Sequence, residues 1–375
     1  MKVLHVYRTY FPDPPGGLQE AIRQIAISTQ KFDVESRIFA LSPNPHPHEI
    51  NRPEGLVIRA RSWASPASCD LGLSTAFSRF SAQAEWADVI HYHFPWPFAD
   101  VLNYFVKPGK PSVVTYQSDV VGKGWLGRLY RPLTRFMLNR MNAVIATSPA
   151  YAESSFILKN QVKAERLHTI PLGITESSYE KFRQDAADVV LQERFGLEPN
   201  SFILFVGVLR PYKGLKTLVE AVAQTDITLA IAGTGREQAY LNSLAATLPN
   251  IHLLGQVSNA EKMALIRGCR ALVLPSHLRS EAFGMVLVEA AMCARPMISC
   301  EIGTGTSFIN LHQETGLVVP PADPVALAEA MNALQCNDEM ANQMGQAARV
   351  RYEQLFSGPA LGKAYSSLYR KVANG

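Results

Sequence analysis

The sequence predicts an α/β protein built from two Rossmann-like domains, with parallel sheets that face a cleft between the domains. The length of 375 residues favours two domains, because a single hydrophobic core stops growing at about 250–300 residues. Short runs rich in β-branched and aromatic residues alternate with helix-like segments along almost the whole chain. Repeated strand–helix units of this kind form parallel sheets that helices cover on both faces.

The alternation occurs in two series, separated by a polar stretch at about residues 178–200. We therefore place a first domain over 1–180 and a second over 198–355, and expect the last helix, about 356–375, to pack back on the first domain. Strands are expected at 2–7, 34–41, 56–61, 88–93, 112–117, 143–148 and 167–173, and then at 202–209, 228–235, 251–257, 271–276, 296–300 and 316–321.

Composition narrows the classes of function. A charged fraction of 18% and a net charge of +4 are typical of a globular protein without a nucleic-acid partner. The sequence has no apolar run long enough to span a membrane, and its first residues predict a strand and not a signal peptide. The five cysteines form no C-x-x-C pair, which indicates reduced thiols in a cytoplasmic protein and no metal site.

Two glycines, Gly16 and Gly17, follow the first expected strand and open the first expected helix. Bare backbone at a helix start lets amide groups approach a phosphate. A tight turn after the proline-rich loop explains the pair equally well. A dinucleotide-binding fingerprint is excluded, because the nearest sequence, "GTGREQ" at Gly233, lacks the third glycine.

Two cations, Arg210 and Lys213, lie just past the first strand of the second series, in "FVGVLRPYKG". Such a pair at the carboxyl end of a strand can clamp a diphosphate, because arginine binds in a bidentate way and lysine supplies a point charge. The alternative is a solvated basic turn.

Two carboxylates, Glu281 and Glu289, bracket the apolar part of "SEAFGMVLVEAAMCARP" at 280–296. If a helix begins near Gly284, Glu281 lies in the preceding loop and Glu289 lies one to two turns inside the helix. Both can then contact a single ligand whose negative centre lies at the helix N-terminus, as in a diphosphate with a sugar at each end. The alternative is one loop glutamate and one unrelated helix-stabilising glutamate.

Two further features carry polar chemistry. His91 and His93 alternate along an expected strand and share one face at its carboxyl end, which favours packed or acceptor-facing histidines over metal ligands. The segment 123–140 is basic and contains no acid, so it predicts either a helix that lies on anionic lipid or an ordinary helix with one face in the core. The cations of this segment are Lys123, Arg128, Arg131, Arg135 and Arg140.

Taken together, these motifs resemble the retaining glycosyltransferases of family GT4, which have the GT-B fold. The resemblance covers nearly the whole chain, from the glycine loop through the two cations and "GQV" to the paired glutamates. It implies that Glu281, Arg210 and Lys213 are catalytic, with Glu281 on the transferred sugar and Glu289 on the nucleoside ribose. The donor site that it implies consists of Gly16, Gly17, Arg210, Lys213, Gly233, Val257, Glu281, Phe283, Gly284, Met285, Val286 and Glu289.

More narrowly, "VVTYQSDVV", "IATSPAYAESS" and "EIGTGTSFINLHQETGLVVPPAD" resemble bacterial mannosyl- and rhamnosyltransferases that build lipopolysaccharide O-polysaccharide. These enzymes commonly have "YHSD" where this chain has "YQSD", so Gln117 replaces a histidine and cannot titrate. The resemblance implies acceptor contacts from His93, Gln117 and Asp119.

The reaction implied by the resemblance transfers mannose or D-rhamnose from a GDP-sugar to an undecaprenyl-diphosphate-linked glycan in O-antigen biosynthesis. The enzyme is expected to need no metal and no other cofactor, because the sequence has no D-x-D motif. It is expected to be cytoplasmic and peripheral on an anionic membrane surface, the inner face of the bacterial inner membrane. The alternatives are a nucleotide-sugar epimerase of GT-B-like fold and a non-catalytic protein that binds sugar nucleotides.

Overall fold

The computed structural model describes residues 1–375 except 14–15, 66–69, 120–123 and 180–186. The chain forms two compact units, one of Met1–Gly173 with Gly358–Gly375 and one of Ile174–Ser357. The N-terminal part of the first unit ends at Gly173, earlier than the boundary at 180 expected from the sequence. The last eighteen residues, Gly358–Gly375, belong to the first unit.

The first unit contains a nine-stranded sheet in the order β3-β4-β2-β1-β6-β7-β8-β9, with β5 paired to β4. The chain of pairs from β4 to β9 is parallel, and β6 is buried at every residue, as expected for a strand covered on both faces. The strands are β1 (Lys2–Val6), β2 (Glu35–Ser42), β3 (Glu49–Arg52), β4 (Gly55–Ala64), β5 (Leu71–Gly72), β6 (Val89–Phe94), β7 (Ser112–Tyr116), β8 (Ala143–Ala146) and β9 (Leu167–Thr169).

One edge of this sheet departs from the parallel arrangement that the sequence predicts. The strands β3 and β5, which the sequence did not reveal, both pair with β4 in antiparallel fashion. Only Pro53 and Glu54 separate β3 from β4, and a parallel pair needs a crossover of a dozen or more residues. Gly55 completes the turn at φ 139°, where a Cβ would lie 2.1 Å from the carbonyl oxygen of Ser36.

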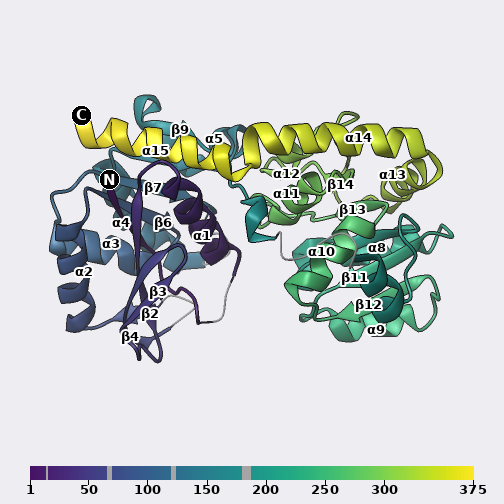
Figure 1. Ribbon diagram of the computed structural model, residues 1–375, viewed down its shortest axis with the longest axis horizontal. Coiled ribbons are helices and arrows are strands. Elements are labelled where there is room, and N and C mark those ends of the chain that lie inside the picture. Colours follow the sequence, from purple (N-terminus) through teal and green to yellow (C-terminus); the bar gives the residue numbers. More distant parts are fainter. Residues whose placement is uncertain (14–15, 66–69, 120–123, 180–186) are drawn as a thin grey trace. The chain divides into compact units, whose positions relative to one another are not determined.

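The C-terminal helix α15 packs against α1 in the first unit (Figure 1). Leu361, Tyr365 and Tyr369 of α15 share a buried core cluster with Val3 of β1 and Ile25 of α1. The described helices of this unit are α1 (Gly17–Gln30), α2 (Ser74–Trp86), α3 (Pro97–Val106), α4 (Gly124–Arg140), α5 (Pro149–Ser154), α6 (Phe156–Gln161), η2 (Ala164–Arg166) and α15 (Gly358–Asn374).

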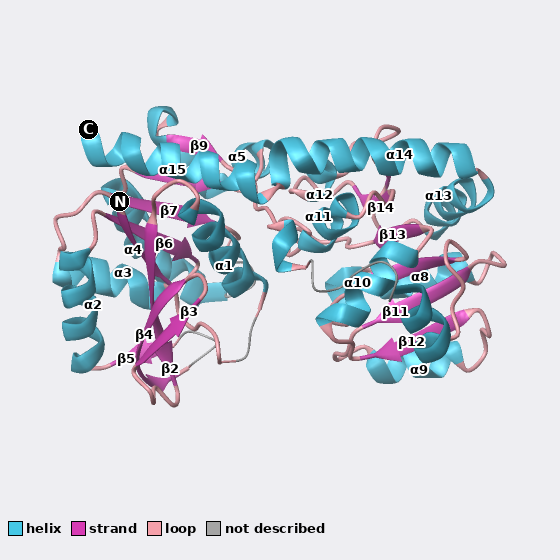
Figure 2. Ribbon diagram, viewed as in Figure 1, coloured by secondary structure: helices cyan, strands magenta, loops and turns pink. Residues whose placement is uncertain are grey.

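The second unit contains a six-stranded parallel sheet in the order β12-β11-β10-β13-β14-β15, shown with its helices in Figure 2. Its strands are β10 (Phe202–Val206), β11 (Thr228–Ala232), β12 (Ile251–Gly255), β13 (Ala271–Leu274), β14 (Met297–Cys300) and β15 (Gly316–Val319). Its described helices are η3 (Glu176–Ser178), α7 (Ala187–Val190), η5 (Leu191–Phe195), η6 (Pro211–Lys213), α8 (Leu215–Val222), α9 (Gln238–Ala245), α10 (Asn259–Gly268), α11 (Met285–Met292), α12 (Thr306–Ile309), α13 (Pro324–Cys336), α14 (Asp338–Arg351) and η7 (Tyr352–Phe356).

The parallel strands of each sheet reverse their order at one place. In the first unit β1 lies between β2 and β6, and in the second unit β10 lies between β11 and β13. The connections leave such a pair of strands on opposite sides, which opens a crevice beyond their carboxyl ends where α/β proteins bind ligands. In the second unit, a ligand site is therefore expected at the carboxyl ends of β10 and β13.

We expect that Gly362→Ala destabilises the first unit. The added Cβ would lie 2.2 Å from the carbonyl oxygen of Ser28 and 2.7 Å from the Phe32 ring. Overpacking of this kind costs about 1–3 kcal/mol. Denaturant unfolding measures the loss, and Lys363→Ala, at an exposed neighbouring position of α15, is the control. Equal stability of the two variants would contradict the close packing of α15 on α1.

Candidate active site

Two side chains that are far apart in the sequence meet at the carboxyl ends of β10 and β13. Lys213 closes η6, which follows β10, and Glu281 lies in the loop between β13 and α11. The Lys213 ammonium forms an ion pair with Glu281 Oε2, and Ser276 Oγ donates to the same oxygen at 3.2 Å. The two charged side chains are only 13% and 12% exposed. A cation and a carboxylate are thus held together at the reversal of strand order.

A glycine fixes this meeting point. Gly214 has φ 72° and follows Lys213 directly, and a Cβ at Gly214 would lie 2.0 Å from the carbonyl oxygen of Pro275. Only glycine allows η6 to approach the end of β13 so closely. The amide of His277 donates to the carbonyl oxygen of Tyr212 at 3.1 Å and joins the same two segments.

The helix start predicted near Gly284 is confirmed. Gly284 is the N-cap of α11 at φ 90°, and no side chain caps the first turn. The backbone amides of a helix N-terminus without a side-chain cap carry partial positive charge and can hold an anion. Phe283 is buried against Phe356, while Met285 and Val286 in the first turn are half-buried.

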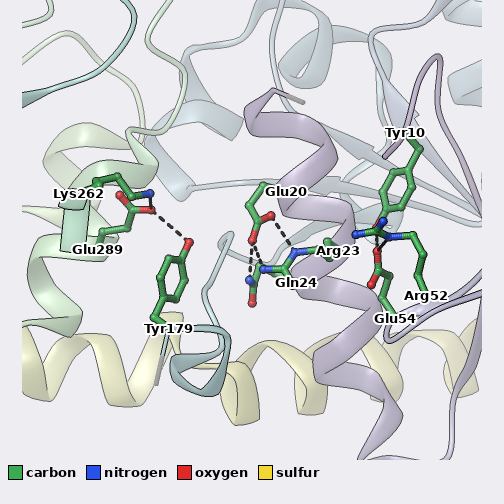
Figure 3. A network of polar contacts seen from close by, with 9 residues as sticks. All are labelled: Tyr10, Glu20, Arg23, Gln24, Arg52, Glu54, Tyr179, Lys262 and Glu289. Carbon is green, nitrogen blue, oxygen red and sulfur yellow. Dashed lines mark hydrogen bonds and ion pairs between the residues drawn. The ribbon is translucent and has the colours of Figure 1, made fainter. Parts of the chain in front are cut away.

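Glu289 lies inside α11, as predicted, and is 7% exposed. Figure 3 shows that its carboxylate faces two donors from other segments. Lys262 Nζ of α10 donates to Glu289 Oε1 at 2.5 Å, and the Tyr179 hydroxyl donates to the same oxygen at 3.3 Å. The sequence interpretation missed both donors. A signal for Lys262 was present, since it is a cation in the first turn of a helix, where the dipole disfavours positive charge.

Arg210 has a different environment from Lys213. Its side chain is exposed and borders a pocket of about 670 Å³ together with Tyr212, Arg236 and Ser280. The pocket offers two guanidinium groups to a ligand, and the diphosphate clamp of Arg210 and Lys213 stays a prediction.

The predicted donor-site residues Gly16, Gly17, Gly233 and Val257 lie in different backbone environments. Gly16 is extended at φ −143°, which any residue adopts, and a Cβ at Gly17 would meet nothing within 4 Å. Backbone strain therefore does not require glycine at either position, and a phosphate contact of the pair stays a prediction. At Gly233 a Cβ would lie 1.9 Å from the carbonyl oxygen of Gly207, so packing alone requires that glycine. Val257 follows β12 and is half-buried.

The predicted acceptor residues His93 and Gln117 lie in a buried hydrogen-bonded chain. His93 Nδ1 is 3.4 Å from Gln117 Nε2, and His93 Nε2 is 3.2 Å from His5 Nδ1. His93 is 1% exposed and Gln117 6%. Burial lowers the pKa of His5 to about 3 and that of His93 well below its ordinary value, so both rings are neutral at physiological pH. Their contact with an acceptor stays a prediction.

His91 is the third buried histidine beside His5 and His93, and hydrogen bonds to hydroxyl groups account for both of its ring nitrogens. Nitrogen atoms of His5, His91 and His93 lie within 4.8 Å of one another. Both His91 nitrogens are already used, at 2.7 Å from the Tyr369 hydroxyl and 2.7 Å from the Thr115 hydroxyl. A neutral imidazole has one donor and one acceptor, so the hydroxyl groups satisfy His91 and leave no nitrogen for an ion.

Asp119 takes part in a network within the first unit. Its Oδ1 accepts hydrogen bonds from the Tyr116 hydroxyl at 3.0 Å and from Ser155 Oγ at 2.8 Å. Its amide donates to the Tyr151 hydroxyl at 2.5 Å. These bonds hold the segment after β7, and an acceptor contact of Asp119 stays a prediction.

The basic segment forms α4, with an exposed aromatic group beside its second half. Lys123 lies outside the described residues, as do the side chains of Arg128 and Arg131. Arg135 and Arg140 are exposed. Next to them Phe136 is 36% exposed, and the α3 residues Tyr104 and Phe105 are 44% and 67% exposed. We call Tyr104, Phe105, Lys107, Phe136 and Arg140 the α3–α4 surface. No helix in the described part of the chain is long and apolar enough to cross a membrane.

Comparisons with known proteins decide the family. The family profile "Glycosyl transferase 4-like domain" matches residues 16–173, and "Glycosyl transferases group 1" matches residues 191–351. The chain is 43% identical to D-rhamnosyltransferase WbpZ of Pseudomonas aeruginosa, over 95% of this chain and 92% of that protein. It is 38% identical to O-antigen chain mannosyltransferase C of Escherichia coli, over 98% of each. The chain belongs to family GT4 of the glycosyltransferases.

Comparison with solved structures supports the same fold. The chain superimposes on HepE of Anabaena in complex with UDP with a TM-score of 0.81 at 19% identity, over 99% of this chain and 100% of that one. WaaG, a glycosyltransferase involved in lipopolysaccharide biosynthesis, gives a TM-score of 0.67 at 18% identity, over 98% and 99%. The predicted GT-B fold is confirmed. The family membership speaks against the epimerase and the non-catalytic binding protein.

We expect that Lys213→Met lowers the free energy of unfolding by about 2 kcal/mol, because Glu281 then keeps a largely buried charge without its partner. Glu281→Gln in the same chain should restore most of the loss. Urea unfolding measures both changes. The control is Lys216→Met, which breaks the exposed Lys216–Glu220 pair of α8 and should cost no more than about 0.5 kcal/mol. If Lys213→Met and Lys216→Met lowered the free energy of unfolding equally, a buried ion pair at Glu281 would be contradicted.

Proposed function

We propose that this glycosyltransferase moves mannose or D-rhamnose from a GDP-sugar to a lipid-linked oligosaccharide in O-antigen biosynthesis, with retention of configuration. The observation that carries the proposal is the full-length similarity to a D-rhamnosyltransferase and to an O-antigen chain mannosyltransferase. The two relatives differ in their sugar, so both donors stand in the proposal. The lipid part of the acceptor is proposed to be undecaprenyl diphosphate.

The geometry of the second unit supports a donor that carries a sugar on a diphosphate. Lys213 and Glu281 are in contact, so a ligand that binds the ammonium through an anionic oxygen brings its neighbouring group to the carboxylate. In a nucleotide sugar the group next to the phosphate is the hexose, whose hydroxyls can donate hydrogen bonds to a carboxylate. The first amides of α11, where no side chain caps the helix, supply further donors for the diphosphate.

The chemistry follows from this placement. As the bond between the sugar and the phosphate breaks, negative charge grows on the leaving diphosphate. Lys213 and Arg210 stabilise that charge, and preorganised charges of this kind account for most of the rate enhancement in many enzymes. In the proposed mechanism the leaving phosphate takes the proton of the acceptor hydroxyl, so no titrating side chain is needed near Gln117. No metal ion is required, because protein cations neutralise the diphosphate.

The activity test uses the full chain, a lipid-diphosphate-linked glycan and a panel of GDP- and UDP-sugars, in buffer that contains EDTA. The proposal expects a new α-linked mannose or rhamnose on the glycan from a GDP-sugar. Transfer from UDP-sugars alone would overturn the donor, and strict dependence on magnesium or manganese would overturn the cationic clamp.

The two glutamates should fail differently. Glu281 faces the reacting sugar, so Glu281→Gln should chiefly lower kcat, because that contact changes during the reaction. Glu289 faces the ribose, remote from the breaking bond, so Glu289→Gln should chiefly raise the donor KM. Steady-state kinetics measure both, with Glu220→Gln at an exposed position of α8 as control. A Glu281→Gln variant that changed only the donor KM would place Glu281 away from the reacting sugar.

We also propose that the enzyme is peripheral on the cytoplasmic face of the inner membrane and that the α3–α4 surface contacts the lipid. Residues 101–152 contain seven Lys or Arg and one acid, Asp119, a net charge of +6 in a chain whose total is +4. The aromatic rings stand next to this charge, since Arg140 lies 5.4 Å from the Phe136 ring and Tyr104 lies 5.2 Å from it. Cations attract anionic head groups, and aromatic rings prefer the interface.

We expect the enzyme to bind phosphatidylglycerol vesicles, and to do so more weakly as salt is raised, because each cation near the surface contributes about 1 kcal/mol. Phe105→Ser and Arg140→Glu should each weaken binding in a flotation assay. The control is Trp63→Ser, since Trp63 is 68% exposed in β4, away from α3 and α4 in the chain, and Phe105 is 67% exposed. Equal binding to phosphatidylcholine vesicles would overturn an electrostatic contact.

A further inference from the structure

We propose that Lys262 and Tyr179 are positioning residues for Glu289 and thereby set the preference of the donor site for ribose over deoxyribose. The inference rests on the proposed function, which gives Glu289 the ribose as its ligand. Lys262 comes from α10 and Tyr179 from the segment after η3, so two separate parts of the second unit converge on one carboxylate of α11 (Figure 3).

The contacts fix the orientation of the carboxylate. Both donors bind Glu289 Oε1, Lys262 at 2.5 Å and Tyr179 at 3.3 Å. The Lys262 ammonium also lies 5.5 Å from the centre of the Tyr179 ring. The Glu289 and Tyr179 residues are 7% and 6% exposed, so packing restricts both. Because the two donors share one oxygen, we assign the other oxygen, Oε2, to the ribose hydroxyls.

The location of Lys262 in its own helix supports a role outside that helix. The Lys262 amide bonds to the carbonyl oxygen of Ser258, so Lys262 lies in the first turn of α10. The N-terminus of a helix favours acids and disfavours cations, and Glu261 of the capping box with Ser258 follows that rule. Lys262 breaks this rule. Among the described residues, the carboxylate of Glu289 offsets the unfavourable position of the Lys262 charge. A local rule broken in this way is typical of a functional site.

Stability alone is a weak explanation for the pair. A largely buried ion pair is often no more stable than an apolar pair of the same size, because both charges lose their hydration. The first unit contains a comparison, in which Glu54 accepts from the Tyr10 hydroxyl at 3.0 Å and from Arg52 at 2.6 Å. Glu54 has the same types of donor as Glu289, but only 1% of it is exposed. The Arg52–Glu54 pair therefore serves as a matched control, since no ligand is proposed to contact Glu54.

The experiment measures the affinity of the full chain for GDP and for 2′,3′-dideoxy-GDP by isothermal titration calorimetry. The ratio of the two dissociation constants isolates the ribose hydroxyls. In the wild type, GDP should bind about 10- to 100-fold tighter, as expected for a hydrogen bond to a charged group. Lys262→Met should reduce the ratio to that of Glu289→Gln. Lys262→Arg should keep most of it, and Tyr179→Phe should give an intermediate ratio.

The controls separate positioning from stability and from direct contact. Arg52→Met should keep the wild-type ratio, although it also leaves a buried carboxylate without its cation. In a Lys262→Met, Glu289→Gln double variant the ratio should equal that of Glu289→Gln alone, because Lys262 acts through Glu289. Tyr179→Phe removes only a hydroxyl, so it gives an answer even if Lys262→Met does not fold.

The outcomes distinguish this inference from the proposed function. A wild-type ratio in both Lys262→Met and Tyr179→Phe would overturn the inference alone. So would an equal loss of affinity for GDP and dideoxy-GDP in Lys262→Met, which would mean that Lys262 attracts the phosphates. UDP and its dideoxy form are measured in parallel, and a wild type that binds neither nucleotide would overturn the proposed function together with the inference.

Discussion

The site in the second unit depends on one close approach between two backbone segments. Gly214 lies against the carbonyl oxygen of Pro275, at a distance that no side chain would permit. This contact brings the turn after β10 onto the loop after β13. As a result Lys213 meets Glu281, although 68 positions separate them in the sequence. The reversal of strand order opens a crevice beyond the carboxyl ends of β10 and β13. Because Gly214 has no side chain, the segments after both strands can meet there.

Each of the two glutamates forms an ion pair with its own lysine. Glu281 pairs with Lys213 and Glu289 pairs with Lys262, and both carboxylates are largely buried. Side chains held by such partners have little freedom to reorient. In the reaction that we propose, the site therefore presents fixed charges to the donor and does not have to order them. The two partners also differ, because Lys213 follows a strand in a one-turn helix while Lys262 lies inside α10. The two carboxylates therefore have different surroundings, which fits the different roles that we propose for them.

In the first unit the corresponding polar groups are buried and neutral. His5, His91 and His93 lie on β1 and β6, next to the reversal of strand order, and burial lowers the pKa of all three. His91 joins β6 to α15 through the Tyr369 hydroxyl, so the last helix is attached to the centre of the sheet by a hydrogen bond as well as by packing. The polar strand face that the sequence revealed thus holds the C-terminal helix in place. At the carboxyl end of β6, His93 contacts Gln117, and this contact connects the buried histidines to the segment after β7.

The sequence by itself determined the two-series α/β architecture, the start of α11 at Gly284 and the family, because these follow from local periodicity, from glycine positions and from short motifs. It did not reveal β3, because "EINR" before Pro53 is short and its pairing depends on β4. Only the tertiary structure decided that Glu289 has Lys262 and Tyr179 as partners, or that His93 is buried behind other polar groups. Periodicity shows which face of an element is apolar. The neighbour that a polar side chain meets depends on the strand order and on close backbone contacts between distant segments, and no local pattern contains that information.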